Sequence, residues 1–192
     1  MNSAERMMNM PDFMELVTRR RSIRSYLDRE VSMDMIRACV RAARYAPTAC
    51  NRQRIRIAIA TGSARERIVS EALGSVPVRN SWATEAPVIA VFAVDRDILV
   101  HRIAAGLKKI QYDFMDVGIA GEHFVLQATE FGLGTCWIGW FKRDKTAEIL
   151  DLPGSWSVSA MITLGYPASD PGEKKIIPES ESVLFIDGEG DE

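Results

Sequence analysis

Apolar residues recur along this chain with two different periods, which divide it into expected helices and strands. Apolar positions three and four residues apart favour amphipathic helices. The segment after Ser32 is typical, because Ile36, Cys39 and Ala43 fall at helical spacing before Pro47, and Ser32 suits the N-cap. By these criteria, helices are expected over 12–19, 32–46, 63–73, 110–131 and 144–150.

Strands are expected where the period is two or where an apolar run is short and continuous. Residues 54–59 alternate strictly between arginine or alanine and isoleucine, which predicts a strand with one buried face. Residues 88–94 are continuously apolar, as in a strand covered on both faces, and 158–164 form the last clear strand. Helices and strands mix without regular βαβ alternation, so the pattern favours the α+β class, with a central mixed sheet flanked by helices.

Caps, glycines and prolines define the connections between these elements. Ser63 and Glu66 predict a capping box that opens the third helix, and 77–87 is expected to be a loop. The helix over 110–131 is apolar nearly all round and carries the small residues Gly118 and Gly121. Such a helix is buried either in a core or at a subunit interface.

Composition indicates an ordinary globular chain, and we expect a single domain over its 192 residues. Hydrophobic residues make up 47% of the sequence and the net charge is −2, which gives no overall attraction to nucleic acid or to acidic membranes. The three cysteines have no metal-site or disulfide spacing, so a cytoplasmic location is expected. Residues 1–10 are interpreted as a loose leader rather than a signal peptide, and 167–192 as an extended, proline-marked tail.

Four arginines lie within six residues, at Arg19, Arg20, Arg21 and Arg24, around Ser22. One interpretation is a solvated helix end, where cations complement the helix dipole. The other is an anion site, because guanidinium forks match phosphate oxygens and a serine hydroxyl adds a donor. The residues alone leave both open, but the isolated cluster and negative net charge argue against nucleic acid.

Two further segments carry candidate chemistry. Residues 46–53 (Ala-Pro-Thr-Ala-Cys-Asn-Arg-Gln) join a helix to a strand and carry the amides of Asn51 and Gln53, which suit the edge of a heterocycle. Residues 131–140 are expected to form a glycine- and tryptophan-rich turn able to cover a flat ring, but they lack the third glycine of a dinucleotide fingerprint. A plain polar turn and a hydrophobic core turn are the alternative interpretations.

Taken together, these segments resemble the nitroreductase family. The resemblance rests on residues 20–26, 46–53 and 132–139, on Asp116–Ala120, and on Leu164–Ala168, in that family's order and spacing. It covers about Phe13 to Pro178. It implies a three-layer α/β/α fold with a mixed, mainly antiparallel sheet, in a domain-swapped type of homodimer that carries FMN.

The resemblance also implies the cofactor contacts. Arg20, Arg21, Ser22 and Arg24 would hold the FMN phosphate, the ribityl chain and the N1/O2 side of the ring. Pro47, Thr48 and Asn51 would lie along the isoalloxazine with Gln53 behind them. Trp137, Ile138 and Gly139 would pass over the ring from either subunit, with the Gly139 backbone N–H bonded to flavin N5.

The chain departs from the family pattern in three places. Arg54 and Ile55 follow the Asn-x-Gln motif where members often have proline and an aromatic residue, and Thr48 stands in place of the usual serine. The basic residue that contacts phosphate near the C-terminus is carried over to Lys174 or Lys175.

The implied activity is hydride transfer from NADH or NADPH through flavin N5 to a nitroaromatic, a quinone or a similar acceptor, by a ping-pong cycle. No dedicated acid or base is expected, because His123 is predicted to pack in a helix and His101 to lie in a loop. No metal site is expected either. Two alternatives remain: a specialised member that dehalogenates a substrate reductively or fragments its own flavin, and a module that binds FMN without turnover.

Overall fold

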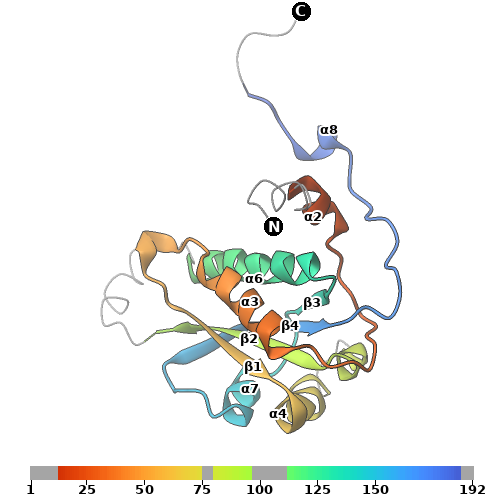
Figure 1. The fold of residues 1–192 in the computed structure, drawn as a ribbon. Coiled ribbons are helices and arrows are strands. Elements are labelled where there is room, and N and C mark those ends of the chain that lie inside the picture. The colour runs from red at the N-terminus through yellow and green to blue at the C-terminus, as the bar shows by residue number, and fades with distance from the viewer. Residues whose placement is uncertain (1–12, 75–79, 97–111, 187–192) are drawn as a thin grey trace, which may run out of the picture.

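Helices pack on both faces of a four-stranded antiparallel sheet of order β1-β2-β4-β3 (Figure 1). The computed structural model describes residues 13–74, 80–96 and 112–186. The strands are β1 (Ile55–Ala60), β2 (Val88–Asp95), β3 (Gly134–Ile138) and β4 (Trp156–Gly165). The helices are α2 (Phe13–Arg19), α3 (Met33–Arg44), α4 (Gly62–Arg67), α6 (Tyr112–Glu130), α7 (Arg143–Ile149) and α8 (Glu179–Ser182), with shorter helical turns η1 (Ala49–Asn51), η2 (Ile68–Leu73) and η3 (Ser81–Thr84).

The continuously apolar run becomes β2, a central strand buried on both faces. Alternate residues, including Val88, Ala90 and Phe92, point to the core beneath α3 and α6, whereas Ile89 and Val91 point to the core beneath η2 and α7. Because side chains alternate across a strand, only a run without polar residues can serve two cores. The predicted two-sided burial and the α+β class are therefore confirmed. The one parallel pairing in the described part of the chain is the isolated Ser22–Thr135 bridge.

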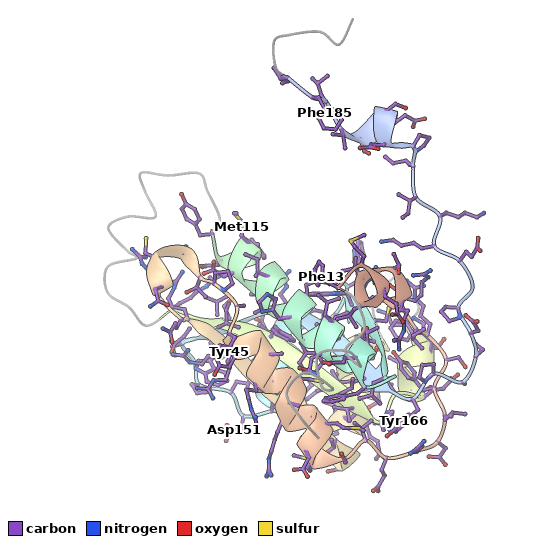
Figure 2. All side chains as sticks on the ribbon, turned by 45° about the horizontal axis from the view of Figure 1, so that its top comes forward. Phe13, Tyr45, Met115, Asp151, Tyr166 and Phe185 are labelled. Carbon is purple, nitrogen blue, oxygen red and sulfur yellow. The ribbon has the colours of Figure 1, made fainter. Side chains whose placement is uncertain are left out.

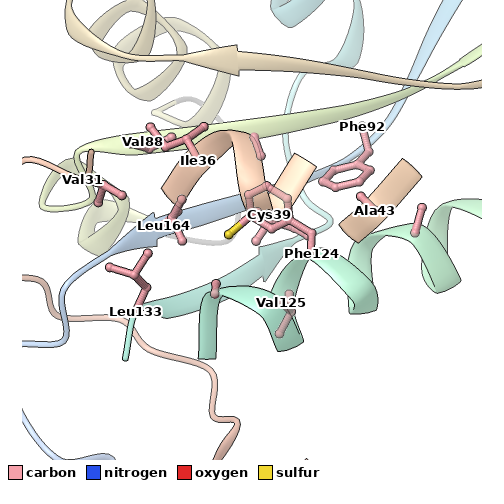
Figure 3. Packing of buried hydrophobic residues seen from close by; sticks show 14 of the residues in the cluster. Val31, Ile36, Cys39, Ala43, Val88, Phe92, Phe124, Val125, Leu133 and Leu164 are labelled. Carbon is pink, nitrogen blue, oxygen red and sulfur yellow. The ribbon is translucent and has the colours of Figure 1, made fainter. Parts of the chain in front are cut away.

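The layer formed by α3 and α6 follows from their apolar faces. The Ser32 side chain accepts the backbone N–H of Met35 at 3.4 Å, as the predicted N-cap of α3. Residues from α3, α6 and the sheet interlock in one cluster, and the Phe92 and Phe124 rings meet edge to face at 5.8 Å (Figure 3). Such an aromatic pair adds about 0.5–1.5 kcal/mol beyond the area that it buries.

The two helical glycines of α6 have different environments. A Cβ on Gly121 would overlap the indole of Trp137, whereas one on Gly118 would meet no atom within 4 Å. Gly121 therefore admits the Trp137 side chain of β3, and of the two environments expected for this helix, a core or a subunit interface, Gly121 lies in the core. Gly118 lies on an exposed face of α6 with Met115 and Ile119.

Three sequence expectations are corrected. Residues 134–138 form strand β3 rather than a turn, because β4 supplies ladder partners for them. The third helix is not opened by Ser63 and Glu66: it begins at Gly62 after Thr61, without a side-chain cap bond. Arg54 does not alternate outward, since it is 4% exposed and pairs with a carboxylate of α6, Asp113.

The tail runs away from the body after β4. Tyr166 and Pro167 are half-buried, but residues 168–186 are exposed, and Phe185 lies well away from the helices and the sheet (Figure 2). This course leaves apolar side chains, Leu184 and Phe185 among them, uncovered within one copy. The leader over 1–10 and His101 lie outside the described residues.

Close packing at Gly121 can be tested by enlarging it. Gly121→Ala should lower the free energy of unfolding by about 1–3 kcal/mol through overpacking against Trp137, although alanine favours helix by about 1 kcal/mol. Urea unfolding measures the change. In a Trp137→Phe background, which removes the second ring, the same substitution should cost much less. Equal costs in both backgrounds would contradict the contact.

Candidate functional site

The arginine-rich segment 20–24 lies directly along β3. The Ile23 N–H donates to the Thr135 carbonyl at 2.8 Å, and Ser22 and Thr135 form the isolated bridge. Ile23 is 7% exposed and packs on Gly134, where an added Cβ would lie 2.7 Å from its side chain. Gly134 is thus required for the close approach, which brings two of the three sequence motifs together.

The Tyr26 side chain links this segment to strand β4. Its buried hydroxyl donates to the Ile23 carbonyl at 2.7 Å and lies 2.7 Å from the Thr163 hydroxyl on β4. Burial raises the pKa of Tyr26 well above its ordinary value, so the hydroxyl remains a donor at neutral pH. The backbone beside Ser22 is therefore fixed to the sheet at two points.

The arginines of the segment have different partners. Arg20 lies 3.7 Å from Glu122 of α6, and the Arg24 guanidinium lies 5.8 Å from the centre of the Trp82 ring. Arg21 instead donates to backbone carbonyls, including that of Gly172 in the tail at 3.1 Å. Arg20 and Arg24 therefore keep donors available for an anion, whereas Arg21 ties the tail to the body.

Cys136 lies between these cations but has the properties of a packing residue. Burial raises the pKa of its thiol, while Arg24 and Ser22 beside it act in the opposite direction. Burial likewise raises the pKa of Cys39, to about 12. Both thiols therefore stay protonated at neutral pH, as buried packing residues rather than reactive thiolates. Cys50 is exposed.

The loop of residues 46–53 has a strained backbone. Cys50, Asn51 and Gln53 all have positive φ, at 55°, 51° and 48°. Left-handed backbone costs about 1–2 kcal/mol for an ordinary L-residue, and it persists only where the surroundings hold it. Pro47, Asn51 and Gln53 are exposed and Thr48 is half-buried. The strain thus falls on the amide-bearing residues that the sequence singles out.

Hydrogen bonds inside the loop orient those amides. The Thr48 hydroxyl accepts the Gln53 N–H at 3.0 Å, and its carbonyl accepts the Asn51 N–H at 2.8 Å. The Gln53 amide donates to Asn51 Oδ1 at 3.0 Å. Thr48, which stands in place of the usual serine, thus keeps a hydroxyl at this position and uses it within the loop. A cavity of about 390 Å³ opens beside Thr48 and Gln53.

The end of β3 presents backbone rather than side chains. The Ile138 side chain is 2% exposed in the core beneath α7, and the Trp137 ring packs under α6 against Gly121. Gly139 follows the strand, is exposed, and has no atom within 4 Å of an ideal Cβ. Along this edge strand, a ligand would therefore meet main-chain groups at Gly139.

One copy does not bring all three segments together. The loop over 46–53 leads into β1, whereas segment 20–24 and Gly139 lie at β3, on the opposite edge of the sheet. Three strand spacings amount to about 14 Å. Helix α6 also keeps the two segments apart, because Ala49 contacts Asp116 whereas Arg20 contacts Glu122, six residues further on and about 9 Å along the helix axis.

The remaining sequence candidates occupy peripheral positions. Lys174 and Lys175 are exposed in the tail, within about 7–10 Å of chain from Gly172, which Arg21 holds. His123 is half-buried, with Nδ1 3.3 Å from the Ala42 carbonyl. Within the described ranges, no cluster of three potential metal ligands occurs, and no helix has the length and apolarity needed to cross a membrane.

Four residues that contact the candidate segments are given no role by the sequence analysis. Asp113, Asp116 and Glu122 project from α6 to the candidate segments, and Trp82 lies beside Arg24. The signal available in the sequence is the presence of carboxylates in an otherwise apolar helix. Their partners are more than 50 residues away along the chain, so spacing does not reveal them.

Comparison with known proteins places this geometry in context. An FMN reductase [NAD(P)H] from Bacillus subtilis is 28% identical to this chain, in an alignment that covers 88% of this chain and 72% of the reductase. An NADH dehydrogenase from Thermus thermophilus is 29% identical, covering 87% and 92%. The fold matches a nitroreductase family protein from Streptococcus pneumoniae with a TM-score of 0.78 at 20% identity, covering 91% of this chain and 100% of the other.

A second solved structure, a nitroreductase family protein from Clostridium difficile, has a TM-score of 0.73 at 28% identity and covers 91% of this chain and 98% of its own. The sequence model of the Nitroreductase family matches residues 17–166, which include segment 20–24, the loop over 46–53, α6 and β3. These residues make up most of the chain. The protein therefore belongs to the nitroreductase family.

Proposed function

We propose that this protein is an FMN-dependent oxidoreductase that takes hydride from NADH or NADPH and reduces a nitroaromatic, a quinone or a similar acceptor. One observation carries the proposal: segment 20–24 lies on the same strand whose far end exposes Gly139. From Thr135 to Gly139 the strand runs about 13 Å. An extended ligand with a phosphate at one end and a planar ring at the other suits this arrangement.

The donors present fit FMN. Arg20 and Arg24 retain guanidinium N–H groups for phosphate and for the N1/O2 side of the ring, and Ser22, between them in sequence, is exposed. Lys174 and Lys175 are candidates for a further phosphate contact, since Arg21 holds the tail nearby. FMN supplies the hydride-transfer chemistry when it is bound. FMN reductases and NADH dehydrogenases among the relatives support this assignment.

The chain's own residues bind and orient in this proposal. The Arg24 guanidinium would favour negative charge on the N1/O2 side of the bound ring, and the Gly139 N–H would be the donor to N5. The exposed faces of Pro47, Thr48 and Asn51 would lie along the ring, with Gln53 behind them. No side chain is assigned as a dedicated acid or base. The acceptor is proposed only as a class.

The proposed assembly is a homodimer, because the loop over 46–53 lies at the opposite sheet edge from segment 20–24. A second copy would bring its loop to this segment. Two uncovered apolar surfaces suit the same partner: the exposed face of α6 around Met115 and Ile119, and the tail around Leu184 and Phe185. Trp137 and Gly139 then belong to the copy that supplies the arginines.

The proposed function is tested with purified protein, FMN and a reduced nicotinamide under anaerobic conditions. We expect FMN to bind and its visible absorbance to disappear on addition of NADH or NADPH. An added quinone should restore the absorbance. Stable yellow colour with tight binding would instead indicate a flavin-binding module without turnover, and retention of FAD rather than FMN would contradict the cofactor assignment.

Alanine substitutions at Arg20 and at Arg24 should have different effects on the midpoint potential of bound FMN. Loss of a guanidinium–phosphate contact at Arg20 should remove roughly 1.5–3 kcal/mol of binding, about ten- to hundredfold in FMN affinity, with little change in midpoint potential. Arg24→Ala should also make the midpoint potential of bound FMN more negative. Arg19→Ala, an exposed neighbour paired with Glu15, is the charge-matched control. Identical potentials in wild type and both variants would refute the assigned roles.

A further inference from the structure

Two carboxylates at the start of α6 hold the loop over 46–53 from both sides. Asp116 is 5% exposed, and its Oδ1 accepts the Ala49 N–H at 3.0 Å, where η1 begins. Asp113, three residues earlier on α6, pairs with the guanidinium of Arg54, the residue that follows the loop. Residues three apart lie on neighbouring positions of a helix surface, so one end of α6 contacts the chain on both sides of Cys50, Asn51 and Gln53.

The backbone between these two contacts is the part that needs support. Cys50, Asn51 and Gln53 are left-handed, a conformation that non-glycine residues leave unless neighbouring contacts maintain it. Bonds from Asn51 and Gln53 to Thr48 close the turn internally but do not fix its position on the body. Contacts with α6, at Ala49 and at Arg54, fix that position.

Arg54 is a distinctive feature of this chain, because its charged side chain is almost wholly buried. The residue is 4% exposed, its Nε has no hydrogen-bond partner among the described residues, and its carbonyl accepts the Asp95 N–H at 3.0 Å. Burying a guanidinium is costly unless a counter-charge lies beside it, and Asp113 supplies that charge. The side chain therefore has one favourable position, set by α6.

We propose that Arg54 and Asp113, together with Asp116, form a clamp that positions Asn51 and Gln53 for the flavin ring. Arg54 and Asp113 are positioning residues, since they act through the loop rather than on the ring. This inference rests on the proposed function for its effect on FMN, but the clamp itself is a property of the protein without cofactor. The two parts can therefore be tested separately.

The first readout is hydrogen–deuterium exchange of the 46–56 backbone in the cofactor-free protein. Arg54→Gln and Asp113→Asn should each accelerate exchange in this segment. The double variant should exchange no faster than the faster of the two single variants, because both substitutions break the same ion pair. Arg67→Gln, which breaks the exposed Arg67–Glu71 pair on another helix, should leave the segment unchanged. Unchanged exchange in folded Arg54→Gln and Asp113→Asn would overturn the clamp.

The second readout is FMN affinity, measured at a temperature where circular dichroism shows every variant to be folded. Both single variants should bind FMN about tenfold more weakly than wild type. The double variant should bind no more weakly than the weaker single variant. Arg54→Lys should recover only part of the affinity, since an ammonium replaces the charge but not the planar fork. Wild-type affinity in all folded variants would overturn the positioning role.

The outcomes separate the clamp from the proposed function. If the wild-type protein binds no FMN while exchange responds as predicted, the clamp stands and the proposed function fails. If FMN binds and exchange does not respond, the function stands and the clamp fails. Should Asp113→Asn not fold, because it leaves the buried Arg54 guanidinium without its counter-charge, Arg54→Gln carries the test, since it removes that charge and the Asp113 side chain that remains is 28% exposed to solvent.

Discussion

The packing of α6 across the sheet is the constraint on which the candidate site depends. Gly121 lets the helix descend onto Trp137, and Phe124 meets Phe92 beneath it. Once α6 is fixed, its polar side chains reach segments that are distant in sequence: Glu122 reaches Arg20, and Asp116 reaches Ala49. The same helix therefore forms part of the core and determines where both sets of candidate cofactor contacts lie.

This arrangement divides the proposed cofactor contacts between the two edges of the sheet. Cations and the open backbone at Gly139 belong to the β3 edge, whereas the amides of Asn51 and Gln53 belong to the β1 side. In the proposed dimer, cofactor binding and assembly are coupled, because each site draws on both copies. Substitutions on the exposed face of α6 would then affect cofactor affinity without touching a cofactor contact.

The sequence predicts the elements better than their environments. The apolar run of β2 and the periodicity of α3 are confirmed, because two-sided burial and a helical face leave direct patterns. The sequence pattern does not predict strand β3, because its glycines suggest a turn and only the pairing with β4 makes the segment a strand. The burial of Arg54 is not predicted by the sequence either, because its alternation with isoleucine indicates an outward side chain. Asp113, 59 residues away along the chain, pairs with Arg54 and holds it inside.

For the site, the family resemblance groups segment 20–24 with the residues of β3, and the structure places the two side by side. It does not reveal that the loop over 46–53 lies at the opposite edge, since strand order is a property of the tertiary fold. Nor does it distinguish Arg21, which holds the tail at Gly172, from its neighbours Arg20 and Arg24.

The most direct test of a site shared between two copies is the FMN content of mixed dimers. One subunit would carry Arg20→Glu and the other Asn51→Asp with Gln53→Glu, near-isosteric changes that replace the side-chain amide donors with carboxylates. Distinct tags allow the mixed species to be isolated, and each variant alone should bind no FMN. A shared site predicts one FMN for every two chains, because one of the two sites then combines intact segments. Mixed dimers without FMN would contradict the account, since each chain would then be building its own site.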